Sequence, residues 1–200
     1  MYVAGEAMRS ITSRALVRAV ALARSMTSWL RKLLLRLQFP GLRFVGEVHV
    51  GPQCEITVVP GGQLTIDNCH IARGVHITVD RDASIVLSAD YVGRNTTIVA
   101  RTLVHIGDGS KIAENVVIRD GNHDHSVPLC EQRYVESPIE IGSDVWLGAG
   151  MIVLAGASVG DGTTVGAGAV VTSAIPSKCV AVGVPAKVVG STIRNGGAPR

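Results

Sequence analysis

The sequence predicts a mostly β fold in which short parallel strands stack into coils, preceded by one amphipathic α-helical segment. The first observation is a six-residue period in the aliphatic residues. The second is composition, because 23 glycines stand beside two phenylalanines, three tyrosines and two tryptophans. A core with so few rings must be built from Val, Ile, Leu and Ala, which favours thin, closely stacked layers.

The chain length and composition suit a single folded domain, since 200 residues with a hydrophobic share of 46% exclude general disorder. The basic character belongs to residues 1–43, which hold eight Lys or Arg and one acid, Glu6, whereas acids outnumber bases in the rest. We therefore expect no nucleic-acid partner for the body. The four cysteines are Cys54, Cys69, Cys130 and Cys179, and no two of them form a CxxC pair. Their scattered positions favour reduced thiols in the cytoplasm.

Residues 1–40 are predicted to form a basic amphipathic helical segment. No Gly or Pro interrupts residues 9–38, and charges inside every apolar stretch exclude both a signal peptide and a spanning helix. Two alternatives remain: the apolar stripe packs on the protein or a partner chain, or it lies on an anionic inner membrane surface with Trp29 at the headgroups. The stripe recurs at three- and four-residue steps: Leu16, Val20, Ala23, Leu30, Leu34 and Leu37.

The repeat occupies residues 41–190. Three six-residue blocks, each a short strand and a turn, close a triangular coil of about eighteen residues, with coils stacked about 4.8 Å apart. The six-residue repeat is followed more loosely between Phe44 and Thr102, and its phase shifts near Pro60-Gly61-Gly62. After the repeat, residues 191–200 are predicted to be a disordered tail. From residue 141 an aliphatic residue heads every block: Ile141, Leu147, Val153, Val159, Val165 and Val171.

A second break in phase lies between Ile118 and Ile141. The charged, proline-containing segment near 124–138 does not continue the coils and is predicted to be extruded as a loop. A loop that leaves a rigid scaffold beside histidines is the expected place of a functional site.

The segments IGDGSKIAENVVIRDGNH (106–123) and PIEIGSDVWLGAGMIVLAGASVGDGTTVGAGAVVTSAIPSKCVAVGVPAKVV (138–189) resemble the hexapeptide-repeat acetyltransferases. The chain is similar to the galactoside, maltose and exopolysaccharide O-acetyltransferases. The resemblance implies a left-handed parallel β-helix, acetyl-CoA as co-substrate without a metal, a sugar acceptor, and a homotrimer with active sites between subunits.

The resemblance also implies roles for particular residues. His123 matches the general base, for which a neutral imidazole suits cytoplasmic pH, and the backbone N–H of Ala149 matches the donor to the oxyanion of a direct transfer. Ser173 stands where a Lys is common, and Gly93 where the galactoside enzymes have an acceptor-binding Asn. The acceptor side is assigned Asn95, His125 and Trp146, and the coenzyme groove Trp146, Ala149, Ala167, Thr172, Ser173 and Lys187.

Several alternatives stay open from the residues. Asp124 or Asp108 is a candidate to orient the imidazole, and Cys130 is a weaker candidate for a covalent nucleophile. His105 lies eighteen residues before His123, so the two are predicted to stack on neighbouring coils, and with His125 they suggest a carbonic-anhydrase-like zinc enzyme.

The resemblance thus implies a cytoplasmic O-acetyltransferase that acetylates a sugar hydroxyl. The basic N-terminal segment favours a cell-surface polysaccharide precursor as the acceptor, and a peripheral position at the inner membrane face remains one of the two alternatives for this segment. A xenobiotic acetyltransferase is the alternative in the same class. A non-catalytic trimeric scaffold is the alternative from another class.

Overall fold

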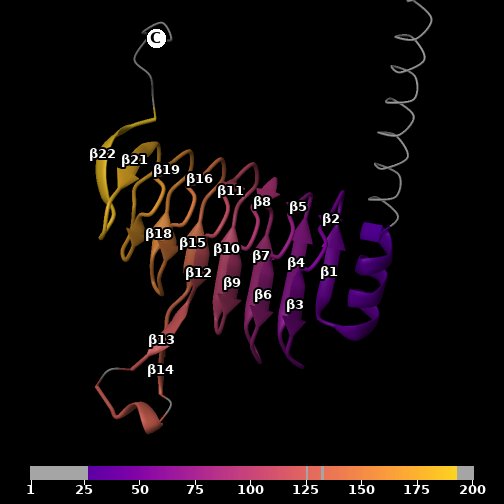
Figure 1. Cartoon of the computed structure of the whole chain (residues 1–200). Helices are drawn as coiled ribbons and strands as arrows, with labels where there is room; N and C mark the ends of the chain where they lie inside the picture. Colours follow the sequence, from indigo (N-terminus) through magenta and orange to yellow (C-terminus); the bar gives the residue numbers. More distant parts are fainter. Residues whose placement is uncertain (1–26, 125, 132, 193–200) are drawn as a thin grey trace, which may run out of the picture.

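The computed structural model describes residues 27–124, 126–131 and 133–192. Stacked coils form a β-solenoid, with one helix at its first end and one hairpin projecting from its side (Figure 1). Each complete coil contributes one strand to each of three sheets, and about six coils follow one another. The predicted fold, a mostly β stack of parallel coils behind an N-terminal helix, is confirmed.

The first face of the solenoid contains β1 (Leu42–Val45), β4 (Gln63–Asp67), β7 (Ser84–Leu87), β10 (Leu103–Ile106), β15 (Ile139–Ile141) and β18 (Ser158–Val159). The second contains β2 (His49–Val50), β5 (His70–Ile71), β8 (Tyr91–Val92), β11 (Lys111–Ile112), β16 (Trp146–Leu147), β19 (Thr164–Val165), β21 (Cys179–Val182) and β22 (Lys187–Ser191). The third contains β3 (Glu55–Val58), β6 (His76–Val79), β9 (Thr97–Ala100), β12 (Val117–Arg119), β17 (Ile152–Val153) and β20 (Val170–Val171).

The coils differ in length along the solenoid. Trp146 pairs with Thr164, 18 residues later, as the six-residue period predicts. His49, however, pairs with His70, 21 residues later. Strands β3, β4 and β6 have four or five residues and bury two side chains each, as the alternating burial of β3 shows. The phase shift near Pro60 follows from these longer strands, so the expected eighteen-residue coil holds only for the C-terminal coils.

The core is an aliphatic column, as predicted. The six residues that head the blocks from Ile141 to Val171 are at most 2% exposed, and the small fifth-place residues, such as Met151 and Ala169, are equally buried. No ring lies in the buried core of the described residues. Stacking like residues at the strand spacing removes a continuous apolar surface from water.

Two edges of the solenoid matter for function. We call the turns between the second and third faces the second corner: residues 51–54, 72–75, 93–96, 113–116, 148–151 and 166–169. We call the turns between the third and first faces the third corner: residues 59–62, 80–83, 101–102, 120–138, 154–157 and 172–174.

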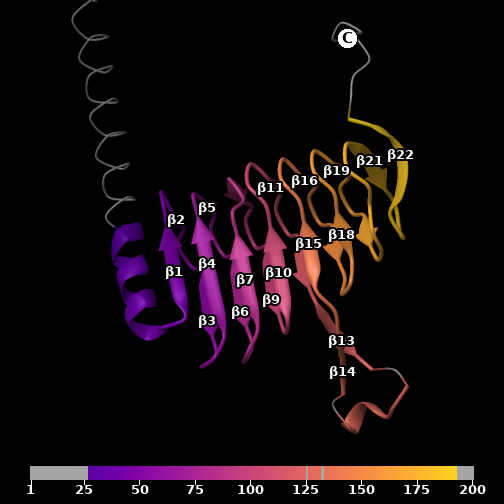
Figure 2. The same ribbon diagram turned by 180° about the vertical axis from the view of Figure 1, so that it is seen from behind.

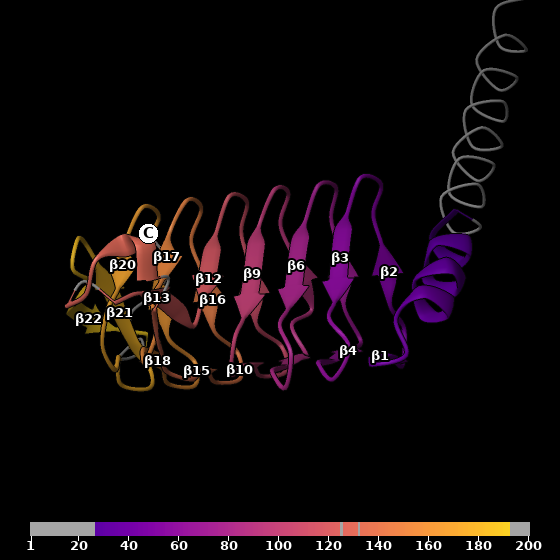
Figure 3. The same ribbon diagram turned by 90° about the horizontal axis from the view of Figure 1, so that it is seen from below.

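The helix at residues 27–38 covers the open end of the first coil (Figure 3). The buried Ser28 hydroxyl accepts a hydrogen bond from the Val50 N–H at 2.9 Å, and Arg31 Nη1 donates to the Val50 carbonyl at 2.6 Å. Leu35 packs against the core. The side chains of Ser28 and Arg31 thus form hydrogen bonds with the N–H and carbonyl of Val50 in β2, the edge strand of its sheet on the side of the helix.

The predicted apolar stripe of this helix is not its packed face. Leu30, Leu34 and Leu37 are 49%, 56% and 75% exposed, because the helix turns Ser28, Arg31 and Leu35 toward the first coil instead. The expectation that the stripe packs on this chain is therefore wrong for these leucines. Leu16, Val20 and Ala23 lie outside the described residues, as do most of the predicted tail and His125. Within the described part of the chain, no helix is long and apolar enough to cross a bilayer.

Candidate active site

A hairpin leaves the solenoid at the third corner, directly after β12 (Figure 2). It consists of β13 (Gly121–His123), the short 3-10 helix η1 (Leu129–Glu131) and β14 (Tyr134–Glu136), and its two strands are antiparallel. His123 is paired directly with Tyr134, and their ring centroids are 4.6 Å apart. The candidate base is therefore held in a strand of the hairpin, and its ring contacts an aromatic neighbour.

Asp120 anchors the base of this hairpin. It is fully buried, and its carboxylate accepts hydrogen bonds from the backbone N–H groups of Arg101, Thr102 and Leu103 at 2.7, 2.7 and 2.9 Å. The Thr102 hydroxyl donates to it as well, at 2.9 Å. Four donors satisfy the buried charge and fix the turn between β9 and β10 against the hairpin. Sequence reasoning missed Asp120, although an acid that ends an aliphatic block just before a glycine was a usable signal.

Arg101 joins the hairpin to the neighbouring coil. Its guanidinium lies over the Tyr134 ring at 3.6 Å, and it contacts Glu136 at 3.2 Å and Asp80 at 3.5 Å. A Cβ at Gly121 would meet the Arg101 Cδ at 2.5 Å, so the absence of a side chain there lets Arg101 lie along this face of the hairpin. Cation–π and ionic contacts of this kind are worth a few tenths to about 2 kcal/mol each.

Among the contacts between described residues, no hydrogen bond or ion pair joins the His123 ring to the carboxylate of Asp124 or Asp108, the two aspartates considered for orienting it. The Asp124 carboxylate accepts hydrogen bonds from the Ser126 N–H and hydroxyl at 2.8 and 2.6 Å. Asp108 lies in the turn between β10 and β11, on a different edge from the hairpin. Cys130 is exposed on η1.

The stacked histidines of the zinc alternative are not formed. His105 pairs across the coils with Val86 and Glu140, and its Nδ1 lies 3.3 Å from the Glu140 carboxylate. The predicted stack with His123 is wrong because β13 leaves the solenoid before the next coil begins. No cluster of three potential metal ligands occurs among the residues that the structure describes.

Ala149 and Ala167 occupy the second corner on neighbouring coils, where the Gly168 N–H donates to the Ala149 carbonyl at 2.9 Å. Within the described chain no hydrogen bond engages the Ala149 N–H, and this residue is partly accessible. Trp146, three residues earlier on β16, is 50% exposed between Lys111 and Thr164 of the flanking coils. This edge thus offers a free donor beside an exposed ring.

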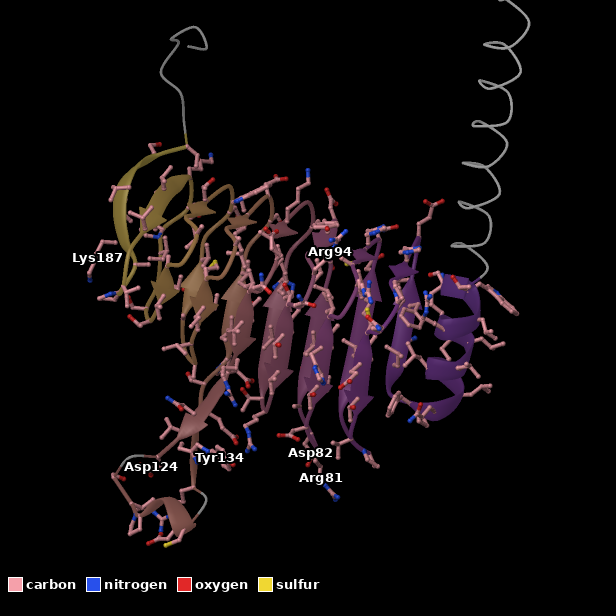
Figure 4. All side chains as sticks on the ribbon, viewed as in Figure 1. Arg81, Asp82, Arg94, Asp124, Tyr134 and Lys187 are labelled. Atoms are coloured by element: carbon pink, nitrogen blue, oxygen red, sulfur yellow. The ribbon has the colours of Figure 1, made fainter. Side chains whose placement is uncertain are left out.

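The remaining predicted residues are scattered over the solenoid. Thr172 and Ser173 lie at the third corner, two coils beyond the hairpin, and Lys187 is exposed on β22 (Figure 4). Asn95 lies at the second corner with φ of 56°, so its backbone has a structural task in the turn. Within one chain, His123 is on the third corner while Ala149, Ala167 and Asn95 are on the second.

Comparison with known proteins gives the family. Residues 138–173 match the bacterial transferase hexapeptide family, described as six repeats. A probable acetyltransferase of Mycobacterium tuberculosis is 33% identical over 180 residues, which are 83% of this chain and 59% of that protein. A putative lipopolysaccharide biosynthesis O-acetyl transferase of Escherichia coli K12 is 42% identical over 133 residues, 60% of this chain and 68% of that protein.

Solved structures similar to this chain are also acetyltransferases or acyltransferases. A galactoside acetyltransferase in complex with coenzyme A is 28% identical with a TM-score of 0.57, covering 71% of this chain and 66% of that one. An N-acyltransferase of Bacillus cereus, solved with a dTDP-linked amino sugar and coenzyme A, has a TM-score of 0.65 at 16% identity, over 80% and 89% of the two chains. At that identity the second match shows the fold alone.

The chain belongs to the bacterial hexapeptide transferase family. It spans 59% of the length of the mycobacterial relative and 49% of a galactoside O-acetyltransferase of Escherichia coli K12, to which it is 39% identical over 100 residues.

Proposed function

We propose that this chain is an O-acetyltransferase that moves an acetyl group from acetyl-CoA to a sugar hydroxyl. The observation that supports this most directly is the backbone N–H of Ala149, which is unpaired within the described chain and lies in the segment that matches the hexapeptide family. We propose His123 as the general base from the resemblance of residues 106–123. A free, fixed N–H is the group that a developing oxyanion requires.

In the proposed mechanism, His123 accepts the proton of the acceptor hydroxyl as its oxygen attacks the thioester carbonyl of acetyl-CoA. The tetrahedral intermediate places its oxyanion at the Ala149 N–H. Its collapse breaks the carbon–sulfur bond, and the CoA thiolate takes the proton from the imidazolium. The products are the acetyl ester and free CoA, and no bond to the enzyme forms.

The proposed site requires more than one chain. The two groups of residues lie on different corners of the same solenoid, so a single chain does not place the base beside the oxyanion donor. A homotrimer, in which the third corner of one chain faces the second corner of the next, brings them together. Trp146, Ala167, Thr172, Ser173 and Lys187 are proposed to line the coenzyme groove between chains.

The proposed acceptor is the sugar of a cell-surface polysaccharide precursor, with Asn95, His125 and Trp146 on the acceptor side. The E. coli relative whose printed name refers to lipopolysaccharide biosynthesis supports this choice. A xenobiotic hydroxyl would use the same base and donor, so both classes belong in the assay.

The helix is proposed to place the enzyme on the inner membrane face. Its outward side exposes Trp29, Leu30, Leu33, Leu34 and Leu37, and Lys32 and Arg36 supply positive charge on the same helix. An apolar stripe with cationic flanks suits the surface of an anionic bilayer, where lipid-linked precursors reside.

The test is thiol release from acetyl-CoA with a panel of free, nucleotide-linked and lipid-linked sugars and hydroxylated antibiotics, beside a metal determination. We expect turnover with a sugar and a loss of at least about a hundredfold in His123→Ala. Unchanged activity in this variant overturns the base, and stoichiometric zinc in the active protein overturns metal-free transfer.

A further inference from the structure

One row of residues runs along the whole second corner. The second residue of each second-corner turn accepts a hydrogen bond at its carbonyl from the N–H of the left-handed residue on the next coil, at 3.1 Å for Pro52, 3.2 Å for Arg73, 2.8 Å for Arg94 and 2.9 Å for Glu114. The bond from Gly168 to Ala149, also 2.9 Å, continues the same series. The row therefore reads, from the helix end, Pro52, Arg73, Arg94, Glu114, Ala149 and Ala167.

A hollow lies at the helix end of this row. Its volume is about 450 Å³, and three arginines line it, namely Arg31 from the helix and Arg73 and Arg94 from the corner. The rings of His49, His70 and Tyr91 form one wall, stacked with centroids 4.5 and 5.7 Å apart. Among the described residues that line this hollow, none is acidic.

A second hollow, which shares the rings of His49 and His70 but not that of Tyr91, has the opposite character. It is lined by Glu47 and Asp90, with Lys32 as its one basic residue among the described lining residues. The positive charge is therefore concentrated on the side of the rings that faces the second corner. This side is continuous with the row that contains Ala149.

The three guanidinium groups keep donors for a ligand. Arg31 uses Nη1 on the Val50 carbonyl, and Arg73 uses Nε on the Gln53 side chain at 2.6 Å. Arg94 has no hydrogen bond from its side chain and no ion pair within the described chain, and it is exposed. Because a guanidinium has five N–H donors, each arginine retains several that are suited to paired phosphate oxygens.

The spacing along the row matches a sugar with an attached diphosphate. At about 4.8 Å per coil, Arg94 lies two coils, or about 10 Å, from Ala149, and Arg73 lies about 14 Å away. Glu114 lies on the coil between, and its exposed carboxylate is an acceptor for sugar hydroxyls. A hexose beside Glu114 with its acetylated hydroxyl near Ala149 therefore directs an anomeric diphosphate toward the arginines.

From this arrangement we infer that Arg94, Arg73 and Arg31 bind the diphosphate of the acceptor, so that the acceptor is a sugar diphosphate rather than a free sugar. The inference rests on the proposed function for its acceptor role, but the anion site itself does not. Nucleotide-linked and lipid-linked sugars share this diphosphate, and the assay separates them.

The binding test uses the full chain and inorganic pyrophosphate in titration calorimetry, without acetyl-CoA. We expect Arg94→Gln and Arg73→Gln each to weaken binding by about tenfold or more. The matched control is Arg43→Gln, because Arg43 is an exposed arginine on β1 of the first face, outside the second and third corners, and it should leave binding unchanged. All three positions are exposed, so folding should be preserved, which circular dichroism checks.

The kinetic test compares kcat/KM for a free hexose, a uridine-diphosphate hexose and a polyprenyl-diphosphate hexose. We expect both diphosphates to exceed the free hexose, and Arg94→Gln to raise KM for the diphosphates with little change in kcat. The diphosphate substrate with the higher kcat/KM shows whether the acceptor is a nucleotide-linked or a lipid-linked sugar.

Two results overturn the inference: pyrophosphate binding that is equally weak in the wild type and Arg94→Gln, or acetylation of free hexose as efficient as that of the diphosphates. The second leaves the proposed function standing. Tight pyrophosphate binding that Arg94→Gln abolishes, in a protein that acetylates no sugar, refutes the proposed function and keeps the anion site.

Discussion

The Arg101 guanidinium lies 3.6 Å from the centre of the Tyr134 ring, and this contact ties the projecting hairpin to the solenoid. Tyr134 in turn contacts the His123 ring, with centroids 4.6 Å apart. Because Arg101 also contacts Asp80 on the neighbouring coil, a continuous set of contacts runs from the rigid solenoid to the candidate base. The position of His123 thus depends on side chains distant from it in sequence.

Tyr134→Ala should lower kcat by about tenfold, because a base that loses its ring neighbour is less well positioned. Tyr134→Phe keeps the ring and should retain most activity, and KM for acetyl-CoA should change little in either variant. The matched control is Val135→Ala, since Val135 is 55% exposed on the other side of the same strand. Equal losses in Tyr134→Ala and Tyr134→Phe would show that the hydroxyl, not the ring contact, matters.

Asp120→Ala should lower the free energy of unfolding by roughly 3 kcal/mol, because three backbone N–H groups lose a charged acceptor. Urea unfolding measures this change. Asp108→Ala is the control, since Asp108 is exposed, and it should stay within about 0.5 kcal/mol of the wild type. A small effect of Asp120→Ala would mean that water replaces the carboxylate at the turn.

Ala149→Pro should lower kcat by about 10²- to 10³-fold, because proline removes the N–H proposed to bind the oxyanion. The turn should accept the ring, since Pro52 occupies the same place on the first coil and follows a glycine, as Ala149 does. Ala149→Ser keeps the N–H and serves as the control. If Ala149→Pro folds with the wild-type Tm and full activity, another group binds the oxyanion.

Leu34→Glu combined with Leu37→Glu should reduce co-sedimentation with anionic lipid vesicles by tenfold or more, since each buried leucine contributes about 1.5–3 kcal/mol. Val189→Glu, which adds charge at an exposed valine of β22, should not reduce it. Binding by the double variant equal to that of the wild type would exclude this face of the helix as the membrane contact.

Alkylation by iodoacetamide at pH 8 should modify Cys130 first, because it is exposed. Burial, with a smaller contribution from Asp90, raises the pKa of Cys69 to about 12, so roughly one thiol in 10⁴ is ionised at pH 8. Burial also raises the pKa of Cys54. The stabilisation linked to Cys69 is present below the unfolded pKa near 8.5 and is lost as the pH rises toward 12. Mass spectrometry of timed digests checks the order, and rapid labelling of Cys69 would contradict it.

The six-residue period was sufficient to predict the coils from Ile106 onward, because each block must bury one aliphatic residue in a column with a single spacing. The same counting failed for His105 and His123. Coil length is constant only while the chain stays in the solenoid, and β13 leaves it. Counting also failed between Phe44 and Thr102, where longer strands bury two residues each.

By itself, the sequence determined a thin aliphatic solenoid, a basic helical segment and a set of candidate site residues, since these depend on local period, composition and spacing. Only the tertiary structure decided that Asp120, Arg101 and Tyr134 support His123, that Leu30, Leu34 and Leu37 face outward, and that Arg31, Arg73 and Arg94 surround one hollow. The physical reason is that stacking brings together residues one coil or more apart, and a change of a single residue in coil length alters which side chains meet.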